Sequence, residues 1–160
     1  MGGGREGEDW PDLAGRLVER DGRLAHILPV RVYFEDTDFS GFVYHASYLR
    51  WCERGRSDFL RLLGNDHRGL IDGEGGQERA AFVVRRMSLD FLKPARIDET
   101  LEVESRVKET GAASLTLSQA ISRGGQKIFV AEVLVVLVSL AGKPMRLKAT
   151  LRRAFAGRDG

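Results

Sequence analysis

Apolar and polar residues alternate with a period of two along three stretches of the chain, 86–91, 101–107 and 115–121. Because successive side chains of a strand point to opposite faces, each stretch is predicted to be a strand with one buried face. The segment 28–34 is rich in β-branched and aromatic residues and predicts a further strand. The segment 128–140 is almost entirely apolar, which predicts a central strand covered on both faces.

A single stretch has the period of a helix. Between residues 45 and 63 apolar side chains recur every three or four positions, and arginines occupy the opposite side. Gly64 predicts the end of this helix, because glycine enters the left-handed conformation without steric cost. A short basic helix is predicted over 147–155 and a hairpin turn at 124–125. This order of elements predicts an α+β fold in which one long helix packs on an antiparallel sheet of about five strands.

The domain organisation follows from where these patterns begin and stop. Residues 1–25 have few apolar residues and many glycines and charges, so we expect a flexible N-terminal extension. Residues 26–156 are expected to form one domain and 157–160 a tail, and the Gly-rich stretch 65–78 is expected to be a polar connection. A chain of 160 residues with 42% hydrophobic residues is long enough to bury one core.

Composition and charge argue against several classes of protein. The chain has 25 basic and 23 acidic residues, a formal net charge of +2 and no basic run with interleaved aromatics, so nucleic acid is not an expected partner. The longest apolar run is too short to span a bilayer, which takes about 20 residues. The N-terminal residues lack the apolar stretch of a secretory signal, so the expected location is the cytoplasm.

Cysteine and histidine usage predicts neither a disulfide nor a metal site. Cys52 is the one cysteine and lies on the apolar side of the predicted helix, so we expect an inert buried thiol. His26 and His67 lie in polar segments without the spacing of metal ligands, so we expect surface histidines. No bound metal is therefore expected.

The chemistry-bearing segment lies between the first strand and the helix. Glu35, Asp36 and Asp38 put three carboxylates within four residues. Strand alternation would point Asp36 and Asp38 to one side, and such crowding is expected to raise the pKa of one carboxyl. The helix is expected to start six residues after Asp38, and Gly41 between them would let the backbone approach a ligand. A carboxylate is thus expected to face the positive end of a helix.

This arrangement suits the hydrolysis of a thioester. N–H groups at a helix start can hold the oxyanion that develops on the carbonyl, and Asp38 would attack directly or activate water. His45, seven residues after Asp38, would orient the water, protonate the departing thiolate or tune Asp38. The same residues also occur in solvated turns that cap helices, and the pattern alone does not separate the two cases.

Six runs of residues carry a family resemblance. They are Val30–Asp38, Gly41–Leu49, Glu53–Arg56, Ala81–Met87, Pro94–Arg96 and Ala131–Val136. The most specific string has the form D-T-D-x-x-G-x-V-Y-H and begins at Asp36. Over about residues 28 to 140 the chain resembles the YbgC-type, Tol-Pal-associated acyl-CoA thioesterases of the 4-hydroxybenzoyl-CoA thioesterase family.

The resemblance implies a hot-dog fold and a role for single residues. Asp38 matches the catalytic carboxylate and His45 the active-site histidine of this branch. The amides of Tyr44 and His45 match the position where the helix start meets the thioester carbonyl. The expected oxyanion and substrate-binding residues are Gly41, Val43, Tyr44 and Tyr48.

Two departures from the family pattern bear on the site. Phe34 stands where this branch often carries a tyrosine, so a hydroxyl is lost there or comes from Tyr33. The turn at 109–114 lacks the basic cluster that the aromatic-ring branch has near the phosphates of coenzyme A. The candidate phosphate contacts are instead Arg85, Arg86, Lys93, Arg152 and Arg153.

The resemblance implies hydrolysis of a short- to medium-chain or aryl acyl-CoA to the free acid and coenzyme A. No cofactor is expected, since coenzyme A is part of the substrate. A non-catalytic domain that binds acyl-CoA or acyl-carrier protein, and a hydratase or dehydratase of the same fold, remain as alternatives. The family also implies a homodimer or a dimer of dimers with shared active sites, and an acyl-carrier or membrane-proximal protein is a further expected partner.

Overall fold

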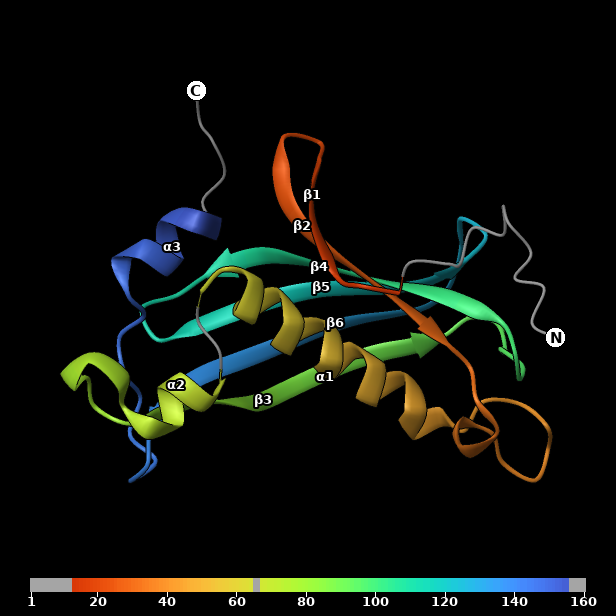
Figure 1. Ribbon diagram of the computed structural model, residues 1–160, viewed down its shortest axis with the longest axis horizontal. Coiled ribbons are helices and arrows are strands. Elements are labelled where there is room, and N and C mark those ends of the chain that lie inside the picture. The colour runs from red at the N-terminus through yellow and green to blue at the C-terminus, as the bar shows by residue number, and fades with distance from the viewer. Residues whose placement is uncertain (1–12, 65–66, 156–160) are drawn as a thin grey trace, which may run out of the picture.

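The structure, a computed structural model, describes residues 13–64 and 67–155. One antiparallel sheet has the strand order β1-β2-β4-β5-β6-β3, and the long helix α1 crosses one face of it (Figure 1). The predicted α+β layout is confirmed, with six strands where about five are expected. The elements are β1 (Arg16–Arg20), β2 (Arg23–Arg31), η1 (Phe34–Asp36), α1 (His45–Leu62), α2 (His67–Asp72), η2 (Glu74–Gly76), β3 (Ala80–Phe91), β4 (Thr100–Thr110), β5 (Ser114–Arg123), β6 (Gln126–Ser139) and α3 (Ala149–Phe155).

The N-terminal boundary of the domain differs from the expectation. The sequence predicts a flexible extension over 1–25, but the sheet begins at Arg16, where β1 pairs with β2. Asp21 and Gly22 have φ values of 53° and 74°, which close the hairpin between the two strands. The side chains of β1 are mostly exposed, so pairing with β2 rather than burial makes it a strand. Residues 1–12 and the predicted tail at 157–160 lie outside the described residues.

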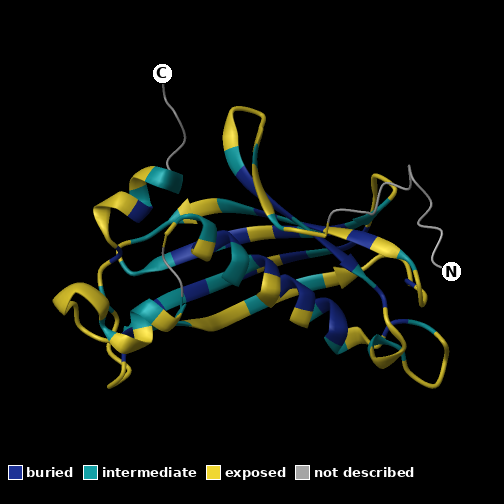
Figure 2. Cartoon of the chain, viewed as in Figure 1, coloured by how far each residue is buried: buried dark blue, intermediate teal, exposed yellow. Residues whose placement is uncertain are grey.

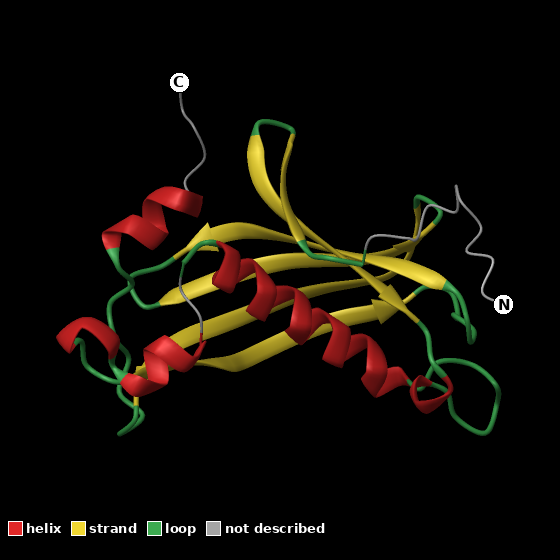
Figure 3. Ribbon diagram, viewed as in Figure 1, coloured by secondary structure: helices red, strands yellow, loops and turns green. Residues whose placement is uncertain are grey.

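Helix α1 begins and ends close to the predicted residues. It runs from His45 to Leu62, and Gly64 just beyond it has a φ of 83°. The connection predicted over 65–78 contains the short helix α2 and the 3-10 turn η2 (Figure 3). Helix α2 contacts both α1 and β3, so it closes one end of the helix-sheet layer. Within the described residues, no helix is long and apolar enough to cross a membrane.

The core lies between α1 and the sheet. Trp51 and Phe59 of the helix are buried in this layer. A Cβ on Gly55 would lie 3.2 Å from Oγ of Ser105 on β4, so the glycine lets the helix approach the strand closely. Cys52 is buried as expected, and burial raises the pKa of its thiol to about 12. Such a thiol carries almost no thiolate at neutral pH and is unreactive.

The face of the sheet away from α1 is only partly covered. Strand β6 lies between β5 and β3, so the prediction of an interior strand is confirmed. Its residues on the helix side, such as Val133 and Leu137, are buried, whereas Leu134, Val136 and Val138 between them are half-buried (Figure 2). The prediction that both faces are covered is therefore wrong for the single chain, because one helix covers one face.

Strand β3 forms a long open edge of the sheet. It has 12 residues, and among the described strands it pairs with β6 alone. Its register shifts between Val84 and Arg86, and Val84 and Phe91 are about half exposed. The unpaired backbone groups of such an edge are a template for another strand.

His26 is buried, contrary to the prediction of a surface histidine. It stacks on Phe59 with 5.4 Å between ring centroids, and its Nε2 lies 2.7 Å from Oδ2 of Asp58. Because an ionised carboxylate can only accept, Nε2 carries the proton. Nδ1 has no hydrogen-bond partner among the described residues. The prediction failed because residues 23–31 form β2, which places His26 under the core side of α1.

The state of His26 makes stability depend on pH. Burial lowers the pKa of His26 by more than the hydrogen bond to Asp58 raises it, while the nearby Arg61 lowers it further. Protonation below the unfolded pKa of about 6.5 therefore favours the unfolded chain. We expect the free energy of unfolding, measured by urea denaturation, to fall as the pH drops from about 7.5 to about 5. His26→Gln keeps an N–H toward Asp58 but does not titrate, so its stability should depend less on pH. Equal pH dependence of both proteins would contradict this assignment.

Candidate active site

The segment between β2 and α1 folds into turns instead of continuing the strand. Oδ2 of Asp36 accepts a hydrogen bond from the N–H of Tyr33 at 2.9 Å and so holds η1. The carboxylate of Asp38 instead accepts from Ser40, on its C-terminal side. Asp36 and Asp38 thus have different partners, and the strand alternation assumed for them does not describe this segment.

Backbone hydrogen bonds hold the end of this segment in place. The N–H of Tyr44 donates to the C=O of Asp36 at 2.8 Å, which closes the segment directly before α1. The N–H of Val43 donates to the C=O of Ala95 at 2.9 Å, in the connection between β3 and β4. Ala95 is fully buried. The start of α1 is therefore positioned against the sheet by main-chain contacts.

Asp38 lies in a tight turn that a glycine closes. Its N–H donates to the C=O of Phe42, and its C=O accepts from the N–H of Gly41, each at 3.0 Å. Gly41 has a φ of 83°, a conformation that favours glycine. The visible role of Gly41 is thus to bring the chain back toward the helix after Asp38.

The carboxylate of Asp38 is exposed and held in its ionised form. Its Oδ1 accepts hydrogen bonds from both the N–H and the hydroxyl of Ser40. These bonds, with a smaller effect of nearby His45, lower the pKa of Asp38 below its ordinary value. The expectation that crowding raises a carboxyl pKa does not hold for Asp38. Within the described chain Oδ2 has no hydrogen-bond partner, so it remains available to a ligand.

The helix start presents two unused N–H groups. The N–H of Tyr44 is engaged by Asp36, and the N–H of Ser47 donates to the C=O of Tyr44 at 2.9 Å. The N–H groups of His45 and Ala46 have no acceptor among the described residues, and no side chain caps the helix. The donors available to an oxyanion are therefore His45 and Ala46, and the expected contribution of the Tyr44 amide is wrong in this chain.

A cleft of about 530 Å³, its open mouth included, lies beside the helix start. The hydroxyl of Tyr48 accepts a hydrogen bond from the N–H of Ala95 at 3.1 Å, so its ring supplies a wall of the cleft. The ring of Phe91 packs edge-on to that of Tyr48 at 5.5 Å and lies 6.3 Å from the imidazole of His45. The lining residues are Val43, His45, Tyr48, Phe91, Leu92, Lys93 and Pro94.

Four of the predicted site residues line the cleft, namely Val43, His45, Tyr48 and Lys93. Asp38, Gly41 and Tyr44 lie in the preceding turns and do not line it, although Asp38 is close enough to His45 for their charges to interact.

The arginines lie elsewhere. Arg86 lies on the sheet face away from α1, in a recess with Glu132, and Arg85 is exposed at the β3 register shift. Arg152 and Arg153 belong to α3 at the far end of the molecule (Figure 1). Lys93 is thus the single candidate phosphate contact that lines the cleft of its own chain, among the described residues.

The sequence analysis did not identify Ser40 and Ala46 as residues of the candidate site, and the departure from the family pattern at Phe34 has little effect in this chain. Ser40 and Ala46 act through turn and helix-start geometry, although the Asp-x-Ser spacing is typical of a turn in which Asp accepts from the residue two positions on. Phe34 is 81% exposed and does not line the cleft, so a tyrosine hydroxyl there would reach solvent in this chain. The described residues contain no cluster of three or more His, Cys, Asp or Glu side chains that could hold a metal.

Comparison with known proteins points to one group of enzymes. The family model of the thioesterase superfamily matches residues 40–130. The acyl-CoA thioester hydrolase YbgC of Escherichia coli O6:H1 is 40% identical over 129 residues, which cover 79% of this chain and 92% of that protein. The acyl-CoA thioesterase YbgC of Haemophilus influenzae is 37% identical over 128 residues, 79% of this chain and 91% of that one. A probable thioesterase from Bartonella henselae superposes with a TM-score of 0.74 at 43% identity, covering 78% of this chain and 99% of that one.

The effect of the Ser40 hydrogen bonds on the pKa of Asp38 should be measurable by titration. Ser40→Ala removes the hydroxyl but keeps the backbone N–H, so we expect the pKa of Asp38 to rise toward its ordinary value. NMR titration of the Asp38 carboxyl carbon would measure this shift. Ser88→Ala, on the other face of the sheet, is the matched control and should leave it unchanged. An Asp38 pKa that is the same in Ser40→Ala and wild type would refute the role given to Ser40.

Proposed function

Because the chain belongs to the thioesterase superfamily, we propose that it hydrolyses acyl-CoA thioesters and that Asp38 is the carboxylate responsible. The chain has the hot-dog fold of that superfamily, and the YbgC relatives that it matches over most of their length are named acyl-CoA thioesterases. One observation carries the proposal: an ionised carboxylate is held in the turn that leads into α1, and the first two N–H groups of that helix have no acceptor among the described residues.

Catalysis would begin with the thioester carbonyl oxygen at the helix start. The N–H groups of His45 and Ala46, at the positive end of α1, would hold the developing oxyanion. Oδ2 of Asp38 would either attack the carbonyl carbon, giving an acyl-aspartyl anhydride that water hydrolyses, or take a proton from the attacking water. In both cases the carbon–sulfur bond breaks, and the imidazole of His45 would supply a proton to the departing thiolate.

The relatives and the state of Asp38 together favour hydrolysis over the alternatives. The YbgC relatives are named acyl-CoA thioesterases, and the hydrogen bonds from Ser40 lower the pKa of Asp38, which keeps its carboxylate ionised. A binding module needs no ionised carboxylate with an unpaired oxygen beside the site of the carbonyl. A thioester is reactive enough for a weakly basic, fully ionised carboxylate to serve.

The cleft supports a short- to medium-chain or aryl acyl group as substrate. Its walls near His45 are the aromatic rings of Tyr48 and Phe91. Such rings pack well on flat or unbranched apolar groups. Lys93 lines the same cleft, and its ammonium is our candidate for a phosphate of coenzyme A.

We also propose that two chains pair through β3. An antiparallel pair centred on the middle of this 12-residue strand would place residue 80 of one chain opposite residue 91 of the other. The start of β3 in one chain would then lie beside the cleft of its partner, which Phe91 lines. Such pairing would satisfy the open edge of the sheet.

The half-buried face of the sheet supports a further contact, as in a dimer of dimers. Leu134, Val136 and Val138 form an apolar stripe along β6, and Glu132 on the same face bonds to Lys108 at 2.8 Å. An apolar stripe with charged neighbours is typical of a contact between subunits.

Replacement of one carboxyl oxygen tests the proposed chemistry. Asp38→Asn is isosteric but neither attacks nor accepts a proton, so we expect hydrolysis of acyl-CoA to fall by about 10³-fold or more. The measurement is release of the coenzyme A thiol across a panel of acyl groups, with substrate binding measured separately. Asp90→Asn, on the other sheet face, is the matched control.

Two results would contradict the proposal. Undiminished release in Asp38→Asn would place the chemistry elsewhere. Tight binding of acyl-CoA by the wild-type protein without any release would make the chain a binding module.

A further inference from the structure

The connection between β3 and β4, residues 92–99, contacts the candidate site through the main chain of one residue. The C=O of Ala95 accepts from the N–H of Val43 at 2.9 Å, and the N–H of Ala95 donates to the hydroxyl of Tyr48 at 3.1 Å. Val43 lies just before the start of α1, and Tyr48 lines the cleft. The two peptide groups on either side of Ala95 therefore hold both the helix start and one wall of the cleft.

The other ends of the same two peptide groups are held by charged side chains. Nη1 of Arg123 donates to the C=O of Pro94 at 2.9 Å. Oε1 of Glu99 accepts from the N–H of Arg96 at 2.7 Å. Nη1 of Arg123 also donates to Oε2 of Glu99 at 2.8 Å, which joins the two side chains into one unit, here called the Arg123–Glu99 clamp.

The rigidity of the peptide group couples this clamp to the site. A trans peptide group is planar, and its C=O and N–H point in opposite directions. In the first of the two groups, the C=O is held by Arg123 and the N–H binds Tyr48. In the second, the N–H is held by Glu99 and the C=O binds Val43. Rotation of either group would disturb its contact with the clamp and its contact with the site together.

The sheet places Arg123 under this connection. Arg123 follows the buried Ile121 by two residues on β5, so both side chains lie on the sheet face that α1 covers. The pairing of β5 with β6 shifts after Ile121 and leaves Ile128 as an extra residue of β6. The C=O of Ile128 accepts from the N–H groups of Leu92 and Lys93, at 2.9 and 3.1 Å. The bulge thus holds the beginning of the connection, and the clamp holds its middle.

We propose that Arg123 and Glu99 are positioning residues of the candidate active site. Neither belongs to the lining of the cleft, and both act through the peptide groups at Ala95. The side chains of the pair are 33% and 26% exposed, so the ion pair is partly shielded from water. Shielding and the added main-chain bonds make it firmer than an exposed pair.

The inference rests on the proposed thioesterase function. The groups that the clamp would position are the N–H groups of His45 and Ala46, which follow Val43 at the start of α1. Their displacement costs most in the transition state, because the full oxyanion forms only there. Loss of the clamp should therefore lower kcat more than it raises KM.

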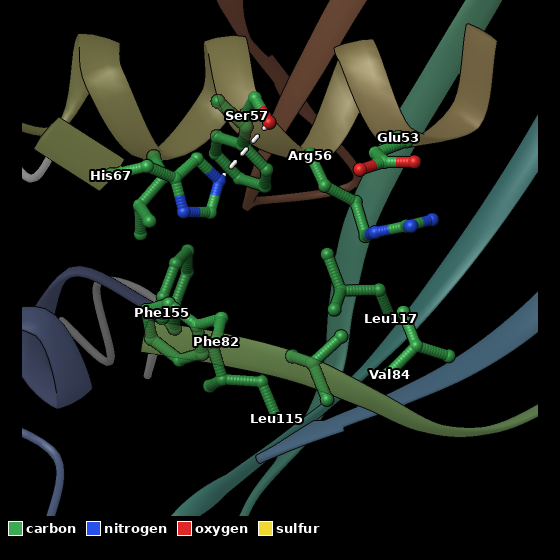
Figure 4. Close-up of a pocket in the computed structure, with 12 residues that line it drawn as sticks. Glu53, Arg56, Ser57, His67, Phe82, Val84, Leu115, Leu117 and Phe155 are labelled. Carbon is green, nitrogen blue, oxygen red and sulfur yellow. Dashed lines mark hydrogen bonds between the residues drawn. The ribbon is translucent and has the colours of Figure 1, made fainter. Parts of the chain in front are cut away.

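A second cavity, beside the C-terminal half of α1, supplies a comparison within the same helix (Figure 4). With its open mouth it holds about 560 Å³, and it is lined by residues of α1, α2, α3, β3, β5 and β6. The hydroxyl of Ser57 and Nε2 of His67 lie 3.0 Å apart there. His67, predicted to lie at the surface, is therefore half-buried and hydrogen-bonded. Ser57→Ala would loosen this end of α1 without touching the clamp.

Hydrogen exchange at the amide of Val43 tests the clamp independently of activity. Arg123→Met removes the guanidinium but keeps an apolar stem, and Glu99→Gln leaves one acceptor oxygen where the carboxylate has two. Each should speed exchange of this amide by about tenfold, the effect of weakening one hydrogen bond. Arg106→Met is the matched control, because Arg106 also pairs with a carboxylate and is 32% exposed. This control and Ser57→Ala should leave the exchange rate unchanged.

Steady-state kinetics test the effect on the reaction. The substrate would be the acyl-CoA that the wild-type protein hydrolyses fastest, with urea denaturation confirming that each variant is folded. Both clamp variants should lower kcat by about tenfold and change KM by less than about twofold. The double variant Arg123→Met/Glu99→Gln should lose no more than the larger single loss, because both changes act through one clamp. Arg106→Met should keep the wild-type kcat.

The outcomes separate this inference from the proposed function. If the wild-type protein hydrolyses no acyl-CoA, the thioesterase proposal fails and the inference fails with it. If hydrolysis occurs but the exchange of Val43 or kcat is unchanged in the clamp variants, the inference alone is overturned. A loss confined to KM, or matched by Arg106→Met, overturns it as well. Faster exchange together with a lower kcat in both clamp variants supports it.

Discussion

Two backbone hydrogen bonds, from Val43 to Ala95 and from Tyr44 to Asp36, fix the geometry on which the site depends. They attach the start of α1 to the connection between β3 and β4 and use up the last two N–H groups before the helix. The next two, of His45 and Ala46, have no acceptor in the described part of the chain, at the electropositive end of the helix. The turn closed by Gly41 then returns the chain so that an ionised carboxylate precedes those donors. The proposed chemistry at Asp38 and at the helix start would therefore depend on main-chain geometry, with side chains supplying the reacting groups.

The same single helix also limits what one chain can do alone. It covers one face of the sheet and, among the described strands, leaves β3 as an open edge. The proposed pairing of two β3 strands would satisfy that edge and would bring the start of β3 in one chain beside the cleft of the other. On this proposal the site at Asp38 is completed by a second chain.

Local patterns were enough to predict α1 and the interior strands, because their residues repeat with the period of a helix or strand. A specific string singled out the segment that is proposed to carry the chemistry. Non-local contacts decided the rest. Strand β1 exists because it pairs with β2, and His26 is buried because Asp58 and Phe59 of α1 pack over it. The pKa of Asp38 moved down instead of up because Ser40 turns back onto it, which depends on turn geometry. The side of the sheet on which Arg86 lies also depends on the register shift in β3, which the sequence does not show.

The activity of the protein as a function of its association state tests the shared site most directly. Release of the coenzyme A thiol would be measured per chain over a dilution series, while light scattering follows the association of the chains. Loss of activity when the dimer dissociates is the predicted result. A monomer as active per chain as the dimer would contradict a site built from two chains.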